Sequence, residues 1–115
     1  WVFGINQANT TLETRKADGS IGAISANYNF LLNTWTYVAV TRSGSSLRFY
    51  INGVSVGEYN SLGSGGLVST AANTTIGRET YAGGYFSFNG AIDAMRVHNR
   101  ALSAAEILAL YNSTK

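Results

Sequence analysis

The stretch Phe88–Tyr111, FNGAIDAMRVHNRALSAAEILALY, predicts a loop, one strand and a closing helix. It opens with Asn89-Gly90, a dipeptide that accepts positive φ and therefore predicts a sharp turn before the strand. Residues 95–98 (MRVH) then alternate apolar and polar side chains, the period-two pattern of a half-buried strand. Ile92 lies on the opposite parity, which predicts a bulge near Asp93 that reverses the inward face.

The end of this stretch carries the signals of a helix start and of one apolar face. Ser103 and Glu106 form the capping box S-x-x-E, in which each side chain accepts a hydrogen bond from an otherwise unpaired amide. Ile107, Leu110 and Tyr111 fall at i, i+3 and i+4 and so form a single apolar stripe. Because a helix of about two turns is unstable alone in water, the stripe must pack on a larger element.

Composition indicates an all-β domain of short strands joined by tight turns. The chain has 115 residues, 12% charged residues, 13 glycines and no proline. Its net charge of +2 is dispersed, with no basic run beyond Arg15-Lys16, so we expect no nucleic-acid partner. There is no cysteine for a disulfide or metal site, and no apolar run approaches the ~20 residues that span a bilayer.

Alternating apolar residues and turn signals predict about eight short strands. The strongest signal is Asn52-Gly53 between two alternating segments, which predicts a tight hairpin; Asp18-Gly19 predicts another. Strands are expected at residues 1–5, 12–16, 21–25, 35–42, 47–51, 54–56, 74–77 and 86–88, and loops at 60–72 and 79–84. With the terminal helix, this pattern favours an antiparallel β-sandwich or jelly roll.

The strand at residues 35–42 is apolar on both faces. Val38 and Val40 share one face, and Trp35, Tyr37 and Ala39 share the other. Such a strand is expected at the centre of its sheet, with one side in the core and the other in a half-buried groove. We expect Trp35 to be a core residue.

Four spaced motifs resemble the laminin G-like, concanavalin A-like lectin/glucanase jelly-roll family. They are WTYVAVTRSG (35–44), LRFYINGVSV (47–56), TIG (75–77) and FNGAIDAMRVHNRALSAAEI (88–107). The resemblance implies two curved antiparallel sheets, often with calcium near a rim. It also implies a secreted or cell-surface protein that binds glycans or other proteins.

The same resemblance implies further strands before the region that Trp1 matches. We therefore expect residues 1–115 to be a single laminin G-like domain that is incomplete at its N-terminus. A sheet lacking those strands has an exposed edge and an uncovered apolar face. Three explanations are then expected: a second chain supplies the missing strands, two protomers pair, or the sequence is a fragment of a longer domain.

Four residues are candidate ligand contacts. Tyr81 and Tyr85 flank a glycine pair, and with Tyr50 they offer aromatic planes with polar tips that suit pyranose rings. Arg78, like Arg48, has a guanidinium that can bind carboxylates or sulfated sugars through paired hydrogen bonds. The competing interpretation is that these are ordinary strand side chains or solvated surface arginines.

Asp93 is the candidate metal ligand. It is the one carboxylate of the closing motif, and calcium prefers carboxylate and backbone carbonyl oxygens. One aspartate cannot hold calcium, so upstream residues or the 79–84 loop would have to contribute ligands. The alternative is that Asp93 accepts a backbone amide at the predicted bulge. His98 is the sole histidine and, without neighbouring ligands, is expected to be a surface strand residue.

The acidic residues argue against catalysis. Glycoside hydrolysis needs two carboxylates about 5–5.5 Å or about 6.5–9.5 Å apart. The six acidic residues are isolated, with no two within four positions: Glu13, Asp18, Glu58, Glu79, Asp93 and Glu106. We therefore expect a non-catalytic recognition module, with carbohydrate as the favoured ligand, in a larger extracellular or cell-surface protein. The alternative is a structural domain that binds protein through an incomplete sheet edge.

Overall fold

The structure, a computed structural model, describes residues 2–5, 11–15, 21–60, 75–81 and 84–114. These residues form eight strands and one helix. In chain order they are β1 (Val2–Ile5), β2 (Leu12–Arg15), β3 (Ile21–Ile24), β4 (Val38–Ser43), β5 (Ser46–Ile51), β6 (Val54–Tyr59), β7 (Arg78–Tyr81), β8 (Gly84–Ser87) and α1 (Ala104–Ser113).

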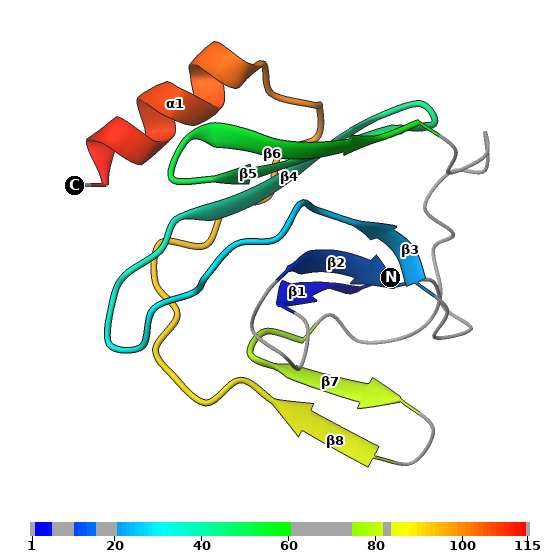
Figure 1. The fold of residues 1–115 in the computed structure, drawn as a ribbon, viewed down its shortest axis with the longest axis vertical. Coiled ribbons are helices and arrows are strands. Elements are labelled where there is room, and N and C mark those ends of the chain that lie inside the picture. Colours follow the sequence, from blue (N-terminus) through cyan, green and yellow to red (C-terminus); the bar gives the residue numbers. More distant parts are fainter. Residues whose placement is uncertain (1, 6–10, 16–20, 61–74, 82–83, 115) are drawn as a thin grey trace.

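The strands form antiparallel sheets that stack in layers. The orders are β1-β2-β3, β4-β5-β6 and β7-β8. Figure 1 shows the helix over one side of the β4–β6 sheet, the β1–β3 sheet on the other side, and the β7–β8 hairpin beyond it. A backbone hydrogen bond of 2.7 Å from the Ala26 amide to the Val56 carbonyl joins the two three-stranded sheets. The predicted all-β antiparallel sandwich with one C-terminal helix is confirmed.

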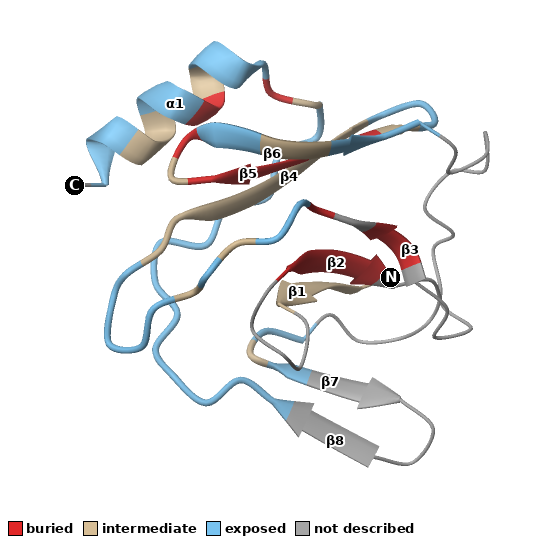
Figure 2. Ribbon diagram, viewed as in Figure 1, coloured by how far each residue is buried: buried red, intermediate tan, exposed pale blue. Residues whose placement is uncertain are grey.

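The main core lies between the two three-stranded sheets. Leu12 and Ala23 from one sheet pack against Leu47, Phe49 and Ile51 from the other. The alternation predicted for residues 47–51 is therefore confirmed, because its apolar members are all buried in this cluster. Figure 2 shows buried residues along β5. Burial of such side chains contributes about 1.5–3 kcal/mol each relative to exposure.

A second, smaller core attaches α1 to the outer face of the β4–β6 sheet. Tyr50, Leu102 and Ile107 are buried there, and Tyr37, Ala39 and Leu110 pack against them. The apolar stripe predicted for the helix therefore packs on the sheet. The two apolar faces of residues 38–41 contact different cores, with Val38 and Val40 at the main core and Ala39 at this one. Two details of the prediction are wrong: β4 lies at an edge of its described sheet, and Trp35, expected in the core, is 71% exposed.

The Asn52-Gly53 turn has the geometry that its sequence predicts. Both residues have positive φ, 50° and 79°, as a type I′ hairpin turn requires. The Asn52 side chain accepts a hydrogen bond from the Tyr37 amide at 3.0 Å and donates one to the Tyr28 hydroxyl at 3.3 Å. The turn therefore also fixes the segment that leads into β4.

The capping box at the start of α1 is present as predicted. The Ser103 hydroxyl accepts from the Glu106 amide at 3.3 Å, and the Glu106 carboxylate accepts from the Ser103 amide at 2.8 Å. Arg100 donates two hydrogen bonds to the same carboxylate, at 3.0 and 2.5 Å. The hydrogen bond from Arg100, followed by those from Ser103, holds the pKa of Glu106 at about 2, below its usual 4.5.

This lowered pKa predicts an acid-dependent loss of stability. Because protonation weakens the cap in the folded state, the Glu106 contribution is fully present above pH 4.5 and is lost as the pH falls through about 2. We expect Glu106→Gln to unfold at lower temperature than the parent at pH 7, and the difference to shrink as acid is added. Thermal unfolding of both proteins across this range measures it. A difference that stays constant with pH would contradict the prediction.

The strand predicted within residues 92–98 is not formed. Residues 91–98 run without strand structure, and Ile92, Met95 and Val97 are all half exposed or more, with Val97 at 86%. No described strand pairs with this segment, and an alternating sequence becomes a strand only when a neighbour accepts its backbone hydrogen bonds. The sharp turn predicted at Asn89-Gly90 also differs, because Gly90 is not among the residues with positive φ. In this segment the left-handed backbone conformation occurs at Ala94, with φ 51°.

The region before this segment also differs from the prediction. Residues 75–77 form a bend instead of a strand, and the expected loop at 79–84 supplies residues 79–81 of β7 and Gly84 of β8. Tyrosine, threonine and phenylalanine favour strands, and this preference outweighs the adjacent glycines. The predicted turn at Asp18-Gly19 and most of the predicted 60–72 loop lie outside the described residues.

Candidate functional site

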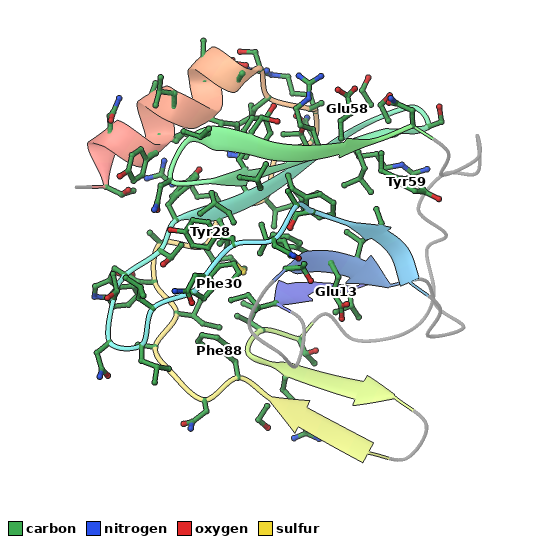
Figure 3. All side chains as sticks on the ribbon, viewed as in Figure 1. Glu13, Tyr28, Phe30, Glu58, Tyr59 and Phe88 are labelled. Carbon is green, nitrogen blue, oxygen red and sulfur yellow. The ribbon has the colours of Figure 1, made fainter. Side chains whose placement is uncertain are left out.

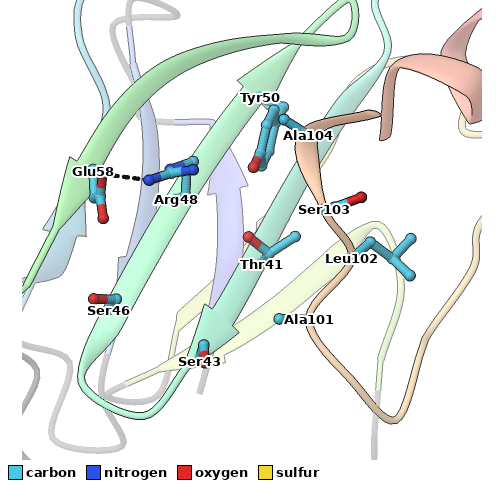
Figure 4. A pocket seen from close by; sticks show the side chains of 10 residues that line it. All are labelled: Thr41, Ser43, Ser46, Arg48, Tyr50, Glu58, Ala101, Leu102, Ser103 and Ala104. Carbon is cyan, nitrogen blue, oxygen red and sulfur yellow. Dashed lines mark hydrogen bonds and ion pairs between the residues drawn. The ribbon is translucent and has the colours of Figure 1, made fainter. Parts of the chain in front are cut away.

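A pocket of about 260 Å³ lies on the outer face of the β4–β6 sheet, beside the start of α1. Its floor comes from all three strands, and the segment at residues 101–104 forms one wall (Figure 4). The lining residues are Thr41, Ser43, Ser46, Arg48, Tyr50, Glu58, Ala101, Leu102, Ser103 and Ala104.

Strand pairing aligns the polar side chains on the pocket floor. Thr41 of β4 lies opposite Arg48 of β5, which lies opposite Glu58 of β6, so the three form one row across the sheet. Ser43 and Ser46 are a second opposed pair. Residues directly opposite on antiparallel strands point to the same face, which is why these polar groups converge.

A β-bulge decides that Glu58 belongs to this face. The register of β5 and β6 shifts between Phe49 and Tyr50, which leaves Val56 unpaired between Gly57 and Ser55. In a regular strand Val56 and Glu58 would share a face, because side chains alternate with period two. The extra residue lets Val56 pack on the main core while Glu58 stands beside Arg48 on the opposite side.

Arg48 and Glu58 form the charged centre of the pocket. The Arg48 Nη2 donates to the Glu58 Oε2 at 2.6 Å, and the two side chains are 42% and 40% exposed. The hydrogen bond to Glu58, and after it the one to the Tyr50 hydroxyl, raises the pKa of Arg48. At this exposure, solvent screens the ion pair and it adds little to stability. Its polar atoms remain accessible to a ligand.

The wall of the pocket is set by the cap of α1. Ser103 is fixed by the capping box, and Leu102, just before it, is buried against Tyr50 and Ile107. Tyr50 itself is only 1% exposed. Figure 4 shows its hydroxyl end directed toward the space between Arg48 and Thr41. Tyr50 therefore offers the pocket a polar tip and no open ring face.

The predicted ligand residues fall in two separate places. Tyr50 lines the pocket, whereas Arg78, Tyr81 and Tyr85 belong to the β7–β8 hairpin, at the far side of the molecule from α1 (Figure 1). Arg78 is exposed at the start of β7. The backbone register places Tyr81 opposite Gly84 and Tyr85 opposite Thr80; the side chains of both tyrosines lie outside the described part.

Asp93, the predicted calcium ligand, is exposed, and its Oδ1 accepts a hydrogen bond from the Ala94 amide at 2.6 Å. This is the alternative role considered for it, next to the left-handed Ala94. The described residues contain no group of three or more His, Cys, Asp or Glu side chains able to hold a metal. Calcium there would need further ligands besides Asp93, such as backbone carbonyls. His98 is also exposed.

The described carboxylates occupy different parts of the fold. Figure 3 shows Glu58 on β6 and Glu13 on β2, in separate layers. Glu13 is buried, Glu58 is paired with Arg48, and Glu106 is held in the helix cap. The charged pair of the pocket is one carboxylate and one guanidinium, which differs from the two carboxylates used in glycoside hydrolysis.

Two antiparallel three-stranded sheets packed face to face, with a helix on the outer face of one of them, define a two-layer antiparallel β-sandwich. The chain belongs to the concanavalin A-like lectin/glucanases superfamily, whose family model matches residues 1–108. The superfamily name covers both binding proteins and hydrolases, so membership alone does not decide between them.

Among solved structures, the chain is similar to an S-layer domain-containing protein (residues 221–444) from Clostridium thermocellum ATCC 27405. The two are 28% identical with a TM-score of 0.50, and the match covers 96% of this chain and 61% of that one. This chain thus spans less than two thirds of that structure. No curated protein matches the chain. Within the described ranges, no helix has the length and apolar character needed to cross a bilayer.

Proposed function

We propose that this chain is a non-catalytic carbohydrate-recognition module of a larger extracellular or cell-surface protein. The superfamily supports a carbohydrate or protein ligand. The similarity to an S-layer domain-containing protein supports a place at the cell surface. The observation on which the proposal depends most is the pocket beside α1, where hydroxyls and one ion pair adjoin a small apolar wall.

The composition of that pocket suits sugar chemistry. Sugars present hydroxyls that both donate and accept hydrogen bonds, together with C–H faces that pack on apolar surface. A cavity of about 260 Å³ lies just below the ~300–1,000 Å³ typical of drug-sized ligands, which fits a single sugar ring. The ion pair and the Thr41 and Ser43 hydroxyls supply donors and acceptors, and Ala101 and Ala104 supply apolar contact.

A glycan array probed with the purified chain tests this function. We expect binding to a restricted set of glycans, with affinities in the millimolar to micromolar range, because one shallow site buries little surface. The chain should release no reducing sugar from any glycan that it binds. Binding by the chain to another polypeptide, with no glycan retained at millimolar concentration, would contradict the proposal.

Calcium binding at Asp93 stays a prediction, and it requires further oxygen ligands besides this one carboxylate. Because an ion that binds only the folded state stabilises it, calcium should then raise the melting temperature relative to a chelated sample. Asp93→Asn should abolish that rise. An unchanged melting temperature with Asp93 intact would count against the site.

A structural role in binding another polypeptide is the second candidate, and it rests on exposed apolar side chains. Monomeric proteins rarely expose large contiguous apolar patches unless these bind a partner. The segments 31–35 and 88–97 expose seven large apolar residues: Leu31, Leu32, Trp35, Phe88, Ile92, Met95 and Val97. An extended strand that paired with residues 92–98 would complete the strand pattern of that sequence. If a second protomer is this strand donor, light scattering should show a dimer for the parent and a smaller dimeric fraction for Val97→Ser.

A further inference from the structure

The charges that line the pocket compensate each other, which bears on the class of sugar that it can hold. Among the described residues that line it, Arg48 and Glu58 are the only charged ones, and they are paired at 2.6 Å. Outside the wall, Arg100 is likewise paired with Glu106. A ligand carboxylate or sulfate would compete with Glu58 for Arg48 and would also lie beside the Glu58 charge. Repulsion between two like charges in contact weakens the binding of such a ligand by about several-fold to tenfold.

The pair nevertheless keeps unused hydrogen-bonding capacity. Glu58 engages Arg48 through Oε2, and its Oε1 has no hydrogen bond among the described residues. The guanidinium of Arg48 carries five N–H donors, of which Glu58 and Tyr50 take only part. A hydroxyl can therefore donate to Glu58 while a neighbouring hydroxyl accepts from Arg48. Two adjacent hydroxyls on a pyranose ring have this arrangement of donor and acceptor.

The remaining lining adds polar and apolar contacts around the pair. Thr41 lies directly across from Arg48 in the same row, and within the described chain its hydroxyl has no hydrogen-bond partner. Ala101 and Ala104 line the opposite wall, where a C–H face of a sugar ring can pack. None of these groups adds charge, so the whole site matches a neutral polyol.

We propose that the Arg48–Glu58 pair binds two adjacent hydroxyls of a neutral pyranose and discriminates against acidic sugars. This inference rests on the proposed carbohydrate function and adds the class of sugar and the residues that select it. Charge-assisted hydrogen bonds supply the selectivity, because Glu58 accepts from the hydroxyl that donates and Arg48 donates to the hydroxyl that accepts.

Calorimetric titration with matched sugars tests the inference. The probes are the methyl glycosides of glucose, galactose and mannose, and the corresponding methyl uronides, which carry a carboxylate in place of the hydroxymethyl group. We expect at least one neutral glycoside to bind, and its uronide to bind about tenfold more weakly. Glu58→Gln should weaken the neutral sugar about tenfold and remove the penalty against the uronide. Arg96→Gln, which also removes one exposed charge but lies outside the pocket, should alter neither.

The outcomes separate this inference from the function on which it rests. A uronide that binds as tightly as its neutral counterpart would overturn the inference and leave carbohydrate recognition intact. A second result would also overturn the inference and leave carbohydrate recognition intact. In it, Glu58→Gln folds normally and binds the sugar unchanged, while Tyr81→Ala or Tyr85→Ala abolishes binding. The site would then be the β7–β8 hairpin. Absence of binding by every sugar, in the titration and on the array, would end both proposals.

Discussion

Replacing Phe49 with alanine is expected to lower the free energy of unfolding by about 3–5 kcal/mol. Phe49 is fully buried between the two three-stranded sheets, and its ring lies 6.4 Å from that of Phe3. The removed ring loses its transfer free energy and leaves a cavity that the hydrogen-bonded sheets cannot close. Denaturant unfolding measures the loss as a lower midpoint at unchanged slope.

Phe88→Ala is the matched control for this substitution. Phe88 lies after β8 and is 49% exposed, so the same truncation removes far less buried surface. We expect a loss of less than about 1 kcal/mol. Equal losses at the two positions would mean that the layer containing Phe49 is not the principal core of the domain.

Much of the fold was predictable because its signals are local. The Asn52-Gly53 turn requires positive φ at two consecutive residues, and that dipeptide is among the few sequences that accept it. The alternation around Phe49 and the capping box at Ser103 likewise depend on residues within a few positions of each other. Local chemistry of this kind fixes a turn, a face or a helix start before any distant contact forms.

The errors fall where structure depends on distant neighbours. Residues 92–98 have a strand sequence, but the described residues place no strand beside them. Trp35 has the size and apolarity of a core residue, yet it precedes β4 at a point where no described layer covers it. Sequence pattern gives the preference of a segment, whereas burial also requires a partner surface.

The pocket was only partly predictable for a related reason. Tyr50 was identified by its chemistry, although it contributes a buried ring with a polar tip. The sequence suggests Arg48 as a side chain that can bind carboxylates or sulfated sugars, with a solvated surface arginine as the alternative, and it assigns no binding role to Glu58. Period-two alternation places Glu58 with Val56, and only the bulge in β6 separates them. A glutamate two residues after a valine, close behind an Asn-Gly turn, is a weak signal that could have suggested it.

Replacing Gly53 with alanine is expected to lower the free energy of unfolding by about 2–4 kcal/mol. Two costs combine. Gly53 has φ 79°, which disfavours any residue with a Cβ. That Cβ would also lie 2.8 Å from Leu108 Cδ1 and 3.3 Å from Leu108 Cα, so α1 would have to shift on the sheet. Thermal and denaturant unfolding measure the loss.

Gly44→Ala separates the two costs. Gly44 also has positive φ, 58°, but a Cβ there meets nothing within 4 Å. We expect it to lose only the backbone contribution, about 1–2 kcal/mol. The excess at Gly53 then measures the tight packing of α1 on the hairpin turn. If both variants lost the same free energy, the helix would not be firmly docked there, and the wall that α1 gives to the pocket would lose its support.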